Sequence, residues 1–220
     1  YLYRNTNPTE SERLAIMATG GYGRGELAPQ SDLDLLFLFP YKQTAWGESV
    51  VEWVLYALWD LGLKVGHATR SVNECIRLAG TDVTIATAML ETRGLWGDDT
   101  MMEEFHTRYW SEVVNPQTAN TFVEAKLAER DARHEKMGDT RYLVEPNLKD
   151  GKGGMRDLQT LYWIGKWVMG VEDASDLVTE GVLTKSEARK FRRAEAFFMT
   201  TRCHLHFLGG RPEERLTFDV

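Results

Sequence analysis

Two short apolar runs, residues 14–18 and 32–39, flank a glycine-rich segment near the beginning of the chain. Each run is short and nearly continuous in apolar side chains, which is typical of a buried strand. Thr19, Gly20 and Gly21 end the first run and predict a tight turn. We therefore expect two buried strands that are connected through a glycine turn.

Longer periodic segments follow. Residues 46–61 carry apolar side chains at helical spacing and stop at Gly62, which predicts a helix. Residues 63–70 predict a third strand, and the sequence S-V-N-E at 71–74 has the form of a capping box that starts a short helix. Residues 91–97 predict a further strand with an exit turn.

The character of the chain changes near residues 115–120. Residues 118–137 are rich in charge with a thin apolar stripe, and every later pattern is helical, including a long helix after the T-K-S-E capping box at 184–187. We expect a domain of residues 1–117 with a small mixed sheet, followed by an all-helical domain of residues 118–220. The predicted fold class is α+β.

Composition narrows the class of protein. The chain has 220 residues, of which 43% are hydrophobic and 27% charged, as in a soluble globular protein. Its net charge of −7 disfavours nonspecific nucleic-acid binding, so we expect a nucleotide rather than a polynucleotide as ligand. The two widely separated cysteines indicate neither a zinc site nor a disulfide framework. No apolar span of 18 residues and no signal peptide is present, so we expect no membrane partner and a cytoplasmic protein.

The glycine turn and the second apolar run carry the candidate chemistry. Glycines at 20, 21, 23 and 25 let backbone approach a ligand closely, and with Arg24 they predict a phosphate cradle. Asp32 and Asp34 lie two residues apart on the predicted strand, so both carboxylates point to the same side. That side can bind a divalent cation. Neither the dinucleotide fingerprint nor the NTPase phosphate loop fits this spacing.

Two long motifs carry a resemblance to known proteins. Gly20-Gly21, ten residues and then Asp32-Leu33-Asp34 resemble the signature of the polymerase-beta-type nucleotidyltransferase superfamily. More narrowly, ATGGYGRGELAPQSDLDLLFL at 18–38 and EPNLKDGKGGMRDLQTLYWI at 145–164 closely resemble the bifunctional enzymes that uridylylate PII signal proteins and remove the uridylyl group.

The resemblance implies an activity and a set of site residues. It implies transfer of UMP from UTP to a tyrosine hydroxyl of a PII nitrogen-regulatory protein, with release of pyrophosphate and two Mg²⁺ ions. A third carboxylate is implied on a neighbouring strand. We favour Glu91, in a short L-E-T-R run, over Asp82, which has the pattern of a helix cap. The implied metal ligands and catalytic residues are Asp32, Asp34 and Glu91, and the implied nucleotide-binding residues include Gly20, Gly21, Arg24 and Ser31.

The second motif supplies another basic turn. Lys152 and Arg156 lie among three glycines directly before a predicted helix, which is typical of an anion site or of a flexible interhelical loop. The resemblance favours a loop that closes on the triphosphate or base across the domain interface. Asp157 is alternatively a cap of that helix. The resemblance also implies hydrolase and glutamine-sensing domains, whose activities we do not expect within these 220 residues.

Other interpretations stay open at this stage. A related enzyme transfers AMP from ATP to glutamine synthetase or another protein, and nothing in the glycine turn reads the base. A nucleotide-binding regulatory module without turnover and a purely structural interaction domain are the non-enzymatic alternatives. His67 and Arg70 could face the site, although a histidine on a sheet is often only structural. We disfavour metal binding by Cys203, His204 and His206, because successive helical positions diverge.

Overall fold

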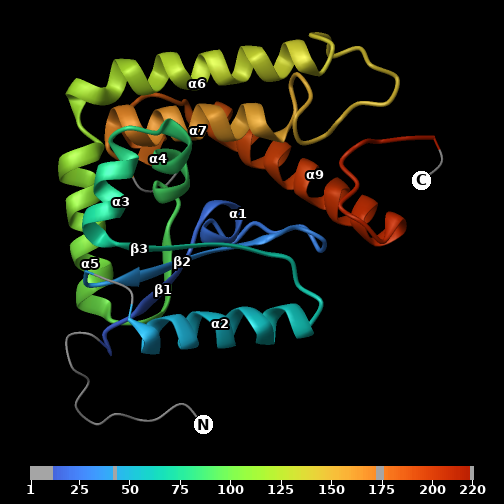
Figure 1. Cartoon of the computed structure of the whole chain (residues 1–220). Coiled ribbons are helices and arrows are strands. Elements are labelled where there is room, and N and C mark those ends of the chain that lie inside the picture. Colours follow the sequence, from blue (N-terminus) through green and yellow to red (C-terminus); the bar gives the residue numbers. More distant parts are fainter. Residues whose placement is uncertain (1–11, 42–43, 172–175, 219–220) are drawn as a thin grey trace. The chain divides into compact units, whose positions relative to one another are not determined.

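The computed structural model of the chain describes residues 12–41, 44–171 and 176–218 (Figure 1). The chain divides into two compact units. The first unit consists of Tyr1–Leu27 and Asp32–Val113, and the second of Ala28–Ser31 and Val114–Val220. In the described part of the chain, no helix is both long and apolar enough to cross a membrane.

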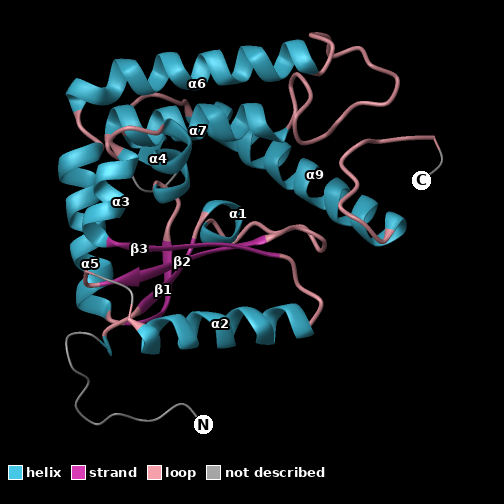
Figure 2. Ribbon diagram, viewed as in Figure 1, coloured by secondary structure: helices cyan, strands magenta, loops and turns pink. Residues whose placement is uncertain are grey.

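The first unit is built on a mixed four-stranded sheet in the order β3-β2-β1-β4. Figure 2 shows β1, β2 and β3 of this sheet in magenta. β1 (Ala15–Ala18) runs antiparallel to β2 (Leu33–Phe39) and to β4 (Arg93–Gly97). β2 runs parallel to β3 (Val65–Ser71). The predicted strands at 14–18, 32–39 and 63–70 are therefore all present.

One face of this sheet makes the main hydrophobic core of the first unit. Leu35, Phe37 and Phe39 of β2 pack against Val50, Val51 and Leu55 of α2 (Ala45–Asp60). Because side chains alternate across a strand, the even-numbered residues of β2 point to the opposite face. The helix predicted over residues 46–61 is thus α2, and it covers the face of the sheet away from Asp34 (Figure 1).

The elements of the first unit that follow β3 along the chain, apart from β4, are helices. α3 (Val72–Ala79) begins with the predicted capping box, in which Ser71 and Glu74 bond reciprocally. α4 (Val83–Met89) and α5 (Asp99–Arg108) lie before and after β4, and a π-helical segment, Tyr109–Val113, ends the unit. The strand predicted at 91–97 begins only at Arg93, because residues 90 and 91 form the turn that leaves α4.

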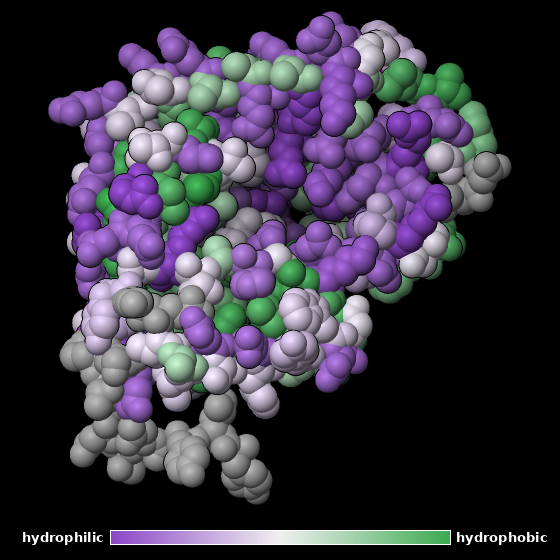
Figure 3. Space-filling model, viewed as in Figure 1, coloured by the Kyte–Doolittle hydropathy of each residue, from purple (hydrophilic) through white to green (hydrophobic). Residues whose placement is uncertain are grey.

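The regular elements described in the second unit are helical. α6 (Pro116–Lys136) and α7 (Met155–Met169) pack together through Phe122 and Trp167, whose rings stack with centroids 3.9 Å apart. α8 (Asp176–Thr179) follows, and α9 (Lys185–Gly209) begins with the predicted capping box of Thr184 and Glu187. Most exposed residues of α6 are hydrophilic, with a few alanines between them (Figure 3). A small mixed sheet followed by helices confirms the predicted α+β fold class.

One glycine lets α2 approach the sheet. Gly47 is buried in the first turn of α2, and an added Cβ there would lie 2.3 Å from Cε1 of the fully buried Phe39. Phe39 packs in the core cluster and has little freedom to move aside. The close approach of α2 to β2 therefore depends on the missing side chain.

We expect Gly47→Ala to destabilise the first unit by about 1–3 kcal/mol through overpacking, which exceeds the gain of roughly 1 kcal/mol in helix propensity. Urea unfolding followed by tryptophan fluorescence measures the effect. Ser49→Ala in the same helix is the matched control, because Ser49 is exposed, and it should change the free energy of unfolding by less than about 0.5 kcal/mol. A Gly47→Ala protein as stable as the wild type would contradict this packing.

Candidate active site in the first unit

Asp34 lies on β2 and Asp32 directly precedes that strand. Both residues are exposed, whereas Leu35 to Phe39 are all buried. Asp34 has the opposite orientation to Leu35, which packs towards α2. The carboxylate of Asp34 therefore points to the face of the sheet on which α1 (Gly20–Gly23) begins.

Two glycines leave room for the Asp34 carboxylate. Gly66 is its direct neighbour on β3, and an added Cβ at Gly66 would lie 2.6 Å from Oδ1 of Asp34. An added Cβ at Gly20 would lie 3.4 Å from Oδ2. Gly20 also has a φ of +54°, a conformation that glycine adopts without strain. The structure thus brings Gly20 next to Asp34, as the sequence predicted for their two motifs, and adds Gly66.

The glycine turn begins as one turn of helix. The backbone N–H of Thr19 donates to the carbonyl of Asp34 at 2.9 Å, so the turn starts directly beside the carboxylate. The amides of Gly23 and Arg24 donate back to the carbonyls of Thr19 and Gly20. Thr19 makes no side-chain cap for the first turn of this helix.

A cavity of about 410 Å³ opens at this place. Thr19 and Gly20 line it from the turn, Asp34 from β2, Gly66 and Arg70 from β3, and Thr84, Ile85, Ala88 and Met89 from or beside α4. His67 also contributes to the lining, and its ring meets Phe37 edge-on with centroids 6.4 Å apart. The cavity therefore combines glycine backbone, a carboxylate and a guanidinium.

Arg24 and Glu91 form a buried ion pair. The side chain of Glu91 is 1% exposed and that of Arg24 is 13% exposed. Arg24 also donates through Nε to Glu26 at 2.9 Å. Burial opposes the charge on Arg24, but the carboxylates of Glu91 and Glu26 outweigh it and raise the pKa of the guanidinium. Arg24, which was predicted to bind the phosphates, and Glu91, which was predicted to bind the metal, are thus paired with each other.

Gly23 and Arg93 fasten the glycine turn to the segment around Glu91. An added Cβ at Gly23 would lie 1.7 Å from the carbonyl oxygen of Glu91, so only glycine fits. Arg93 donates to the carbonyls of Gly23 at 3.2 Å and Tyr22 at 3.0 Å, and its guanidinium lies 5.5 Å from the centroid of the Tyr22 ring. Sequence reasoning gave no role to Arg93, although the E-T-R spacing next to β4 was a usable signal.

Asp82 has a local structural role, as the sequence indicated. Its carboxylate caps α4 by accepting hydrogen bonds from the amides of Thr84 at 2.7 Å and Ile85 at 3.0 Å. Capping uses the same lone pairs that a metal ion would need.

The described residues include no group of three or more His, Cys, Asp or Glu side chains placed to hold a metal ion. Glu91 is not gathered with Asp32 and Asp34, because it is turned to Arg24. Asp34 lines the cavity, and Asp32 is exposed two residues before it. Hard carboxylates of this kind still suit Mg²⁺, which keeps several waters and takes further oxygens from substrate phosphates. The residues present therefore fit a nucleotide-bound magnesium ion better than a metal site made of protein alone.

The remaining predicted residues belong to the second unit. Ser31 donates its amide to the carbonyl of Ala28 at 2.9 Å. Lys152 pairs with Asp139 at 2.8 Å, and Nε of Arg156 lies 3.7 Å from Asp150. Their role at the nucleotide stays a prediction.

The loop that carries Lys152 is compact and internally bonded. Asn147 accepts the amides of Lys149 at 3.0 Å and Asp150 at 2.7 Å. An added Cβ at Gly151 would lie 2.5 Å from the carbonyl of Asn147, so this glycine serves the tight turn. These hydrogen bonds give the loop a defined conformation, which argues against the alternative of a flexible interhelical loop.

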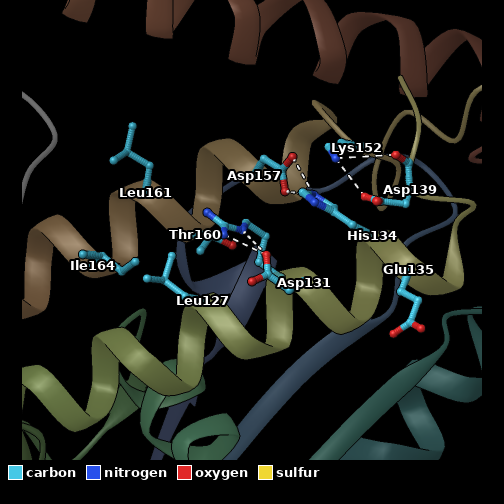
Figure 4. A pocket seen from close by; sticks show the side chains of 11 residues that line it. Leu127, Asp131, His134, Glu135, Asp139, Lys152, Asp157, Thr160, Leu161 and Ile164 are labelled. Atoms are coloured by element: carbon cyan, nitrogen blue, oxygen red, sulfur yellow. Dashed lines mark hydrogen bonds and ion pairs between the residues drawn. The ribbon is translucent and has the colours of Figure 1, made fainter. Parts of the chain in front are cut away.

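Asp157 links this loop to α6. It accepts hydrogen bonds from the amide of Gly153 at 2.7 Å and from Nε2 of His134 at 2.9 Å, and it pairs with Arg133. Burial acts in the opposite direction, but these donors lower the pKa of Asp157. Asp157 and His134 border a pocket of about 800 Å³ between α6 and α7 (Figure 4).

Comparison with known proteins agrees with both motifs. Residues 4–79 match the family described as nucleotidyltransferase domain, and residues 121–220 match the family described as GlnD PII-uridylyltransferase. The chain is 60% identical over 220 residues to a protein of Rhodospirillum rubrum named bifunctional uridylyltransferase/uridylyl-removing enzyme. Proteins of the same name from Rhodopseudomonas palustris and Azospirillum brasilense are 59% and 60% identical over 220 residues.

These matches cover all of this chain but only 23–24% of the length of the three relatives. The resemblance predicted from the two motifs is confirmed. Over its whole length the chain is therefore a relative of about one quarter of the bifunctional uridylyltransferase/uridylyl-removing enzymes, and its first part matches a nucleotidyltransferase domain.

Proposed function

We propose that this chain carries the uridylyl-transfer site of a cytoplasmic enzyme, which moves UMP from UTP to a tyrosine hydroxyl of a PII-type protein and releases pyrophosphate. The observation that carries the proposal is the meeting of the glycine turn and Asp34 in one cavity. Identity of about 60% over the whole chain with proteins named for uridylyl transfer supports it.

The carboxylates have the first role in this proposal. Asp32 and Asp34 would hold two Mg²⁺ ions, which supply charge stabilisation for the oxygens of the reacting phosphate. Gly66 and Gly20 keep the Asp34 carboxylate accessible, since a side chain at Gly66 would meet Oδ1. The negative charge of these aspartates would repel a triphosphate without the ions, so nucleotide and metal should bind together.

The glycine turn and Arg24 have the second role. Backbone without side chains at Gly20 and Gly21 would let the β- and γ-phosphates approach, and Arg24 would pair with them. Arg24 has to release Glu91 to do so, because the two are paired in the structure. Glu91 is then available as the third metal ligand. In this exchange of partners, the phosphates would balance the charge of Arg24 and the metal ion would balance the charge of Glu91.

The acceptor chemistry also suits the site. A phenol has a pKa near 10 and therefore ionises more readily than an aliphatic hydroxyl. Its oxygen has to attack the α-phosphate on the side opposite the leaving pyrophosphate, so holding the triphosphate in a fixed orientation is the main task of these residues. Lys152 and Arg156 are proposed to approach the triphosphate or base as the basic loop of the second unit.

We expect Asp34→Asn to lower transfer by at least about 10³-fold, because it removes a metal-ligand charge worth several kcal/mol without changing volume. Labelled UTP with Mg²⁺ and a PII protein measures the rate, and circular dichroism checks the fold. Asp82→Asn is the matched control: asparagine caps helices as well as aspartate does, so transfer and stability should stay unchanged. If the Asp34→Asn protein transfers UMP at nearly the wild-type rate, the assignment of Asp34 as a metal ligand is wrong.

The role of Glu91 is separable by kinetics. If Glu91 becomes a metal ligand, Glu91→Gln should raise the Mg²⁺ concentration for half-maximal rate by about tenfold or more. If Glu91 acts only through Arg24, the KM for UTP should rise while the Mg²⁺ dependence stays the same, and the third-ligand assignment is then wrong. Thermal unfolding should accompany both measurements, because Glu91 is buried beside Arg24.

Two other functions compete with this proposal: an ATP-dependent protein adenylyltransferase and a nucleotide-binding module without turnover. Comparing the binding of UTP and ATP tests the first, and measuring labelled product tests the second. With Mg²⁺, UTP at about 100 times its Kd should stabilise the protein by roughly 2.7 kcal/mol, which raises Tm by about 5–11 °C. ATP at the same concentration should give a smaller shift. A larger shift with ATP would favour adenylyl transfer, and UTP binding without labelled product would favour the module.

A further inference from the structure

The second unit contains a buried polar cluster that uridylyl transfer does not use. It consists of Arg202 and His206, one turn apart on α9, and Glu214 beyond the end of that helix. Arg202 donates to both oxygens of Glu214, at 2.6 and 2.5 Å, and Nε2 of His206 lies 3.4 Å from Oε1. The side chains of Arg202 and His206 are 5% and 0% exposed. We call these three residues the α9 cluster.

The α9 cluster holds the segment that leads into β2. Ala28–Ser31 belongs to the second unit although the residues on both sides of it belong to the first. The backbone N–H of Gln30 donates to Nδ1 of His206 at 3.1 Å, and Ala28 is buried with 2% exposure. The chain returns to the first unit at Asp32, two residues after this hydrogen bond.

The same cluster holds the second sequence motif. The amide of Leu148 donates to the backbone carbonyl of Glu214 at 2.8 Å, and the amide of Leu216 donates to the carbonyl of Pro146 at 3.0 Å. Nη1 of Arg202 lies 3.4 Å from the sulfur of Met155, where α7 begins. Two motifs that are more than a hundred residues apart in sequence therefore contact the same cluster. The first does so through the ring of His206, and the second through the side chain of Arg202 and the backbone of Glu214.

We propose that His206 is a positioning residue for the carboxylates of β2: its Nδ1 atom fixes the backbone of Gln30 and thereby the path of the chain into Asp32 and Asp34. This inference rests on the proposed function in so far as those carboxylates bind the metal. His206 itself touches neither nucleotide nor metal in this role.

The hydrogen bond defines the state of the ring. Nδ1 can accept from Gln30 only if it carries no proton, so a neutral His206 has its proton on Nε2, the nitrogen nearest Glu214. Burial lowers the pKa of His206, the carboxylate of Glu214 opposes this, and the positive charges of Arg202 and Lys149 add to the lowering. The neutral ring that the geometry requires is thus the favoured form at neutral pH.

Two substitutions separate the two ring nitrogens. The side-chain oxygen of asparagine can occupy the position of Nδ1, so His206→Asn keeps an acceptor for Gln30. Glutamine places its amide near the position of Nε2, so His206→Gln keeps a polar group beside Glu214 but loses that acceptor. Both variants are neutral and polar, and they differ in the contact that the proposal requires.

Amide hydrogen exchange of Gln30, followed by NMR on the 220-residue chain, reads the contact without any turnover. We expect Gln30 to be protected in the wild type and in His206→Asn, and to exchange about tenfold faster in His206→Gln. Uridylyl transfer should divide the three proteins in the same way. We expect the Mg²⁺ concentration for half-maximal rate to be about tenfold higher in His206→Gln than in the wild type, and unchanged in His206→Asn.

The outcomes are distinguishable. Equal exchange of Gln30 in the wild type and His206→Gln would overturn the contact, and faster exchange with unchanged Mg²⁺ dependence would overturn the positioning role. If His206→Gln does not fold, equal protection and equal transfer in His206→Asn and the wild type still support the role of the Nδ1 acceptor, and their loss contradicts it. A wild-type protein without transfer would refute the proposed function, whereas the exchange of Gln30 would still decide the contact.

Discussion

The two-sided character of β2 is the constraint on which the first unit depends. Leu35, Phe37 and Phe39 fill the core against α2, and Asp34 shares the strand with them but points the other way. A shift of one residue in the pairing of β2 would turn the Asp34 carboxylate towards the aromatic rings of the core and turn Leu35, Phe37 and Phe39 away from α2. The core therefore fixes the face on which Asp34 lies, since any register that keeps Phe37 packed against α2 keeps Asp34 on the opposite face of the sheet.

The glycines around this strand act by leaving space at defined points. Gly66 leaves room for the Asp34 carboxylate, Gly23 lets the turn contact the backbone of Glu91, and Gly47 lets α2 approach Phe39. The Arg24–Glu91 pair and the Arg93 hydrogen bonds then hold the turn from the side of β4. These contacts fix the backbone of the glycine turn, which reduces the entropy that the turn would lose on binding a ligand.

The sequence predicted the parts of the structure that depend on local spacing. Alternation along residues 32–39 predicted the orientation of Asp34, and the capping boxes at Ser71 and Thr184 predicted the starts of two helices. Contacts between distant residues left no such signal. Arg24 and Glu91 are 67 residues apart, and Gln30 and His206 are 176 residues apart, so neither contact follows from a periodic pattern. The strand expected at 91–97 was placed too early, because the turn after α4 occupies Glu91.

The detour of Ala28–Ser31 has a consequence for the modularity of the chain. The polypeptide passes between the two units after Leu27, after Ser31 and after Val113, so no single cut separates them into two continuous pieces. A gene segment that ended at Val113 would encode Ala28 without the rest of the unit to which it belongs. The two units should therefore be inherited and exchanged together, as one cassette, rather than as a catalytic module that is free to combine with other helical partners.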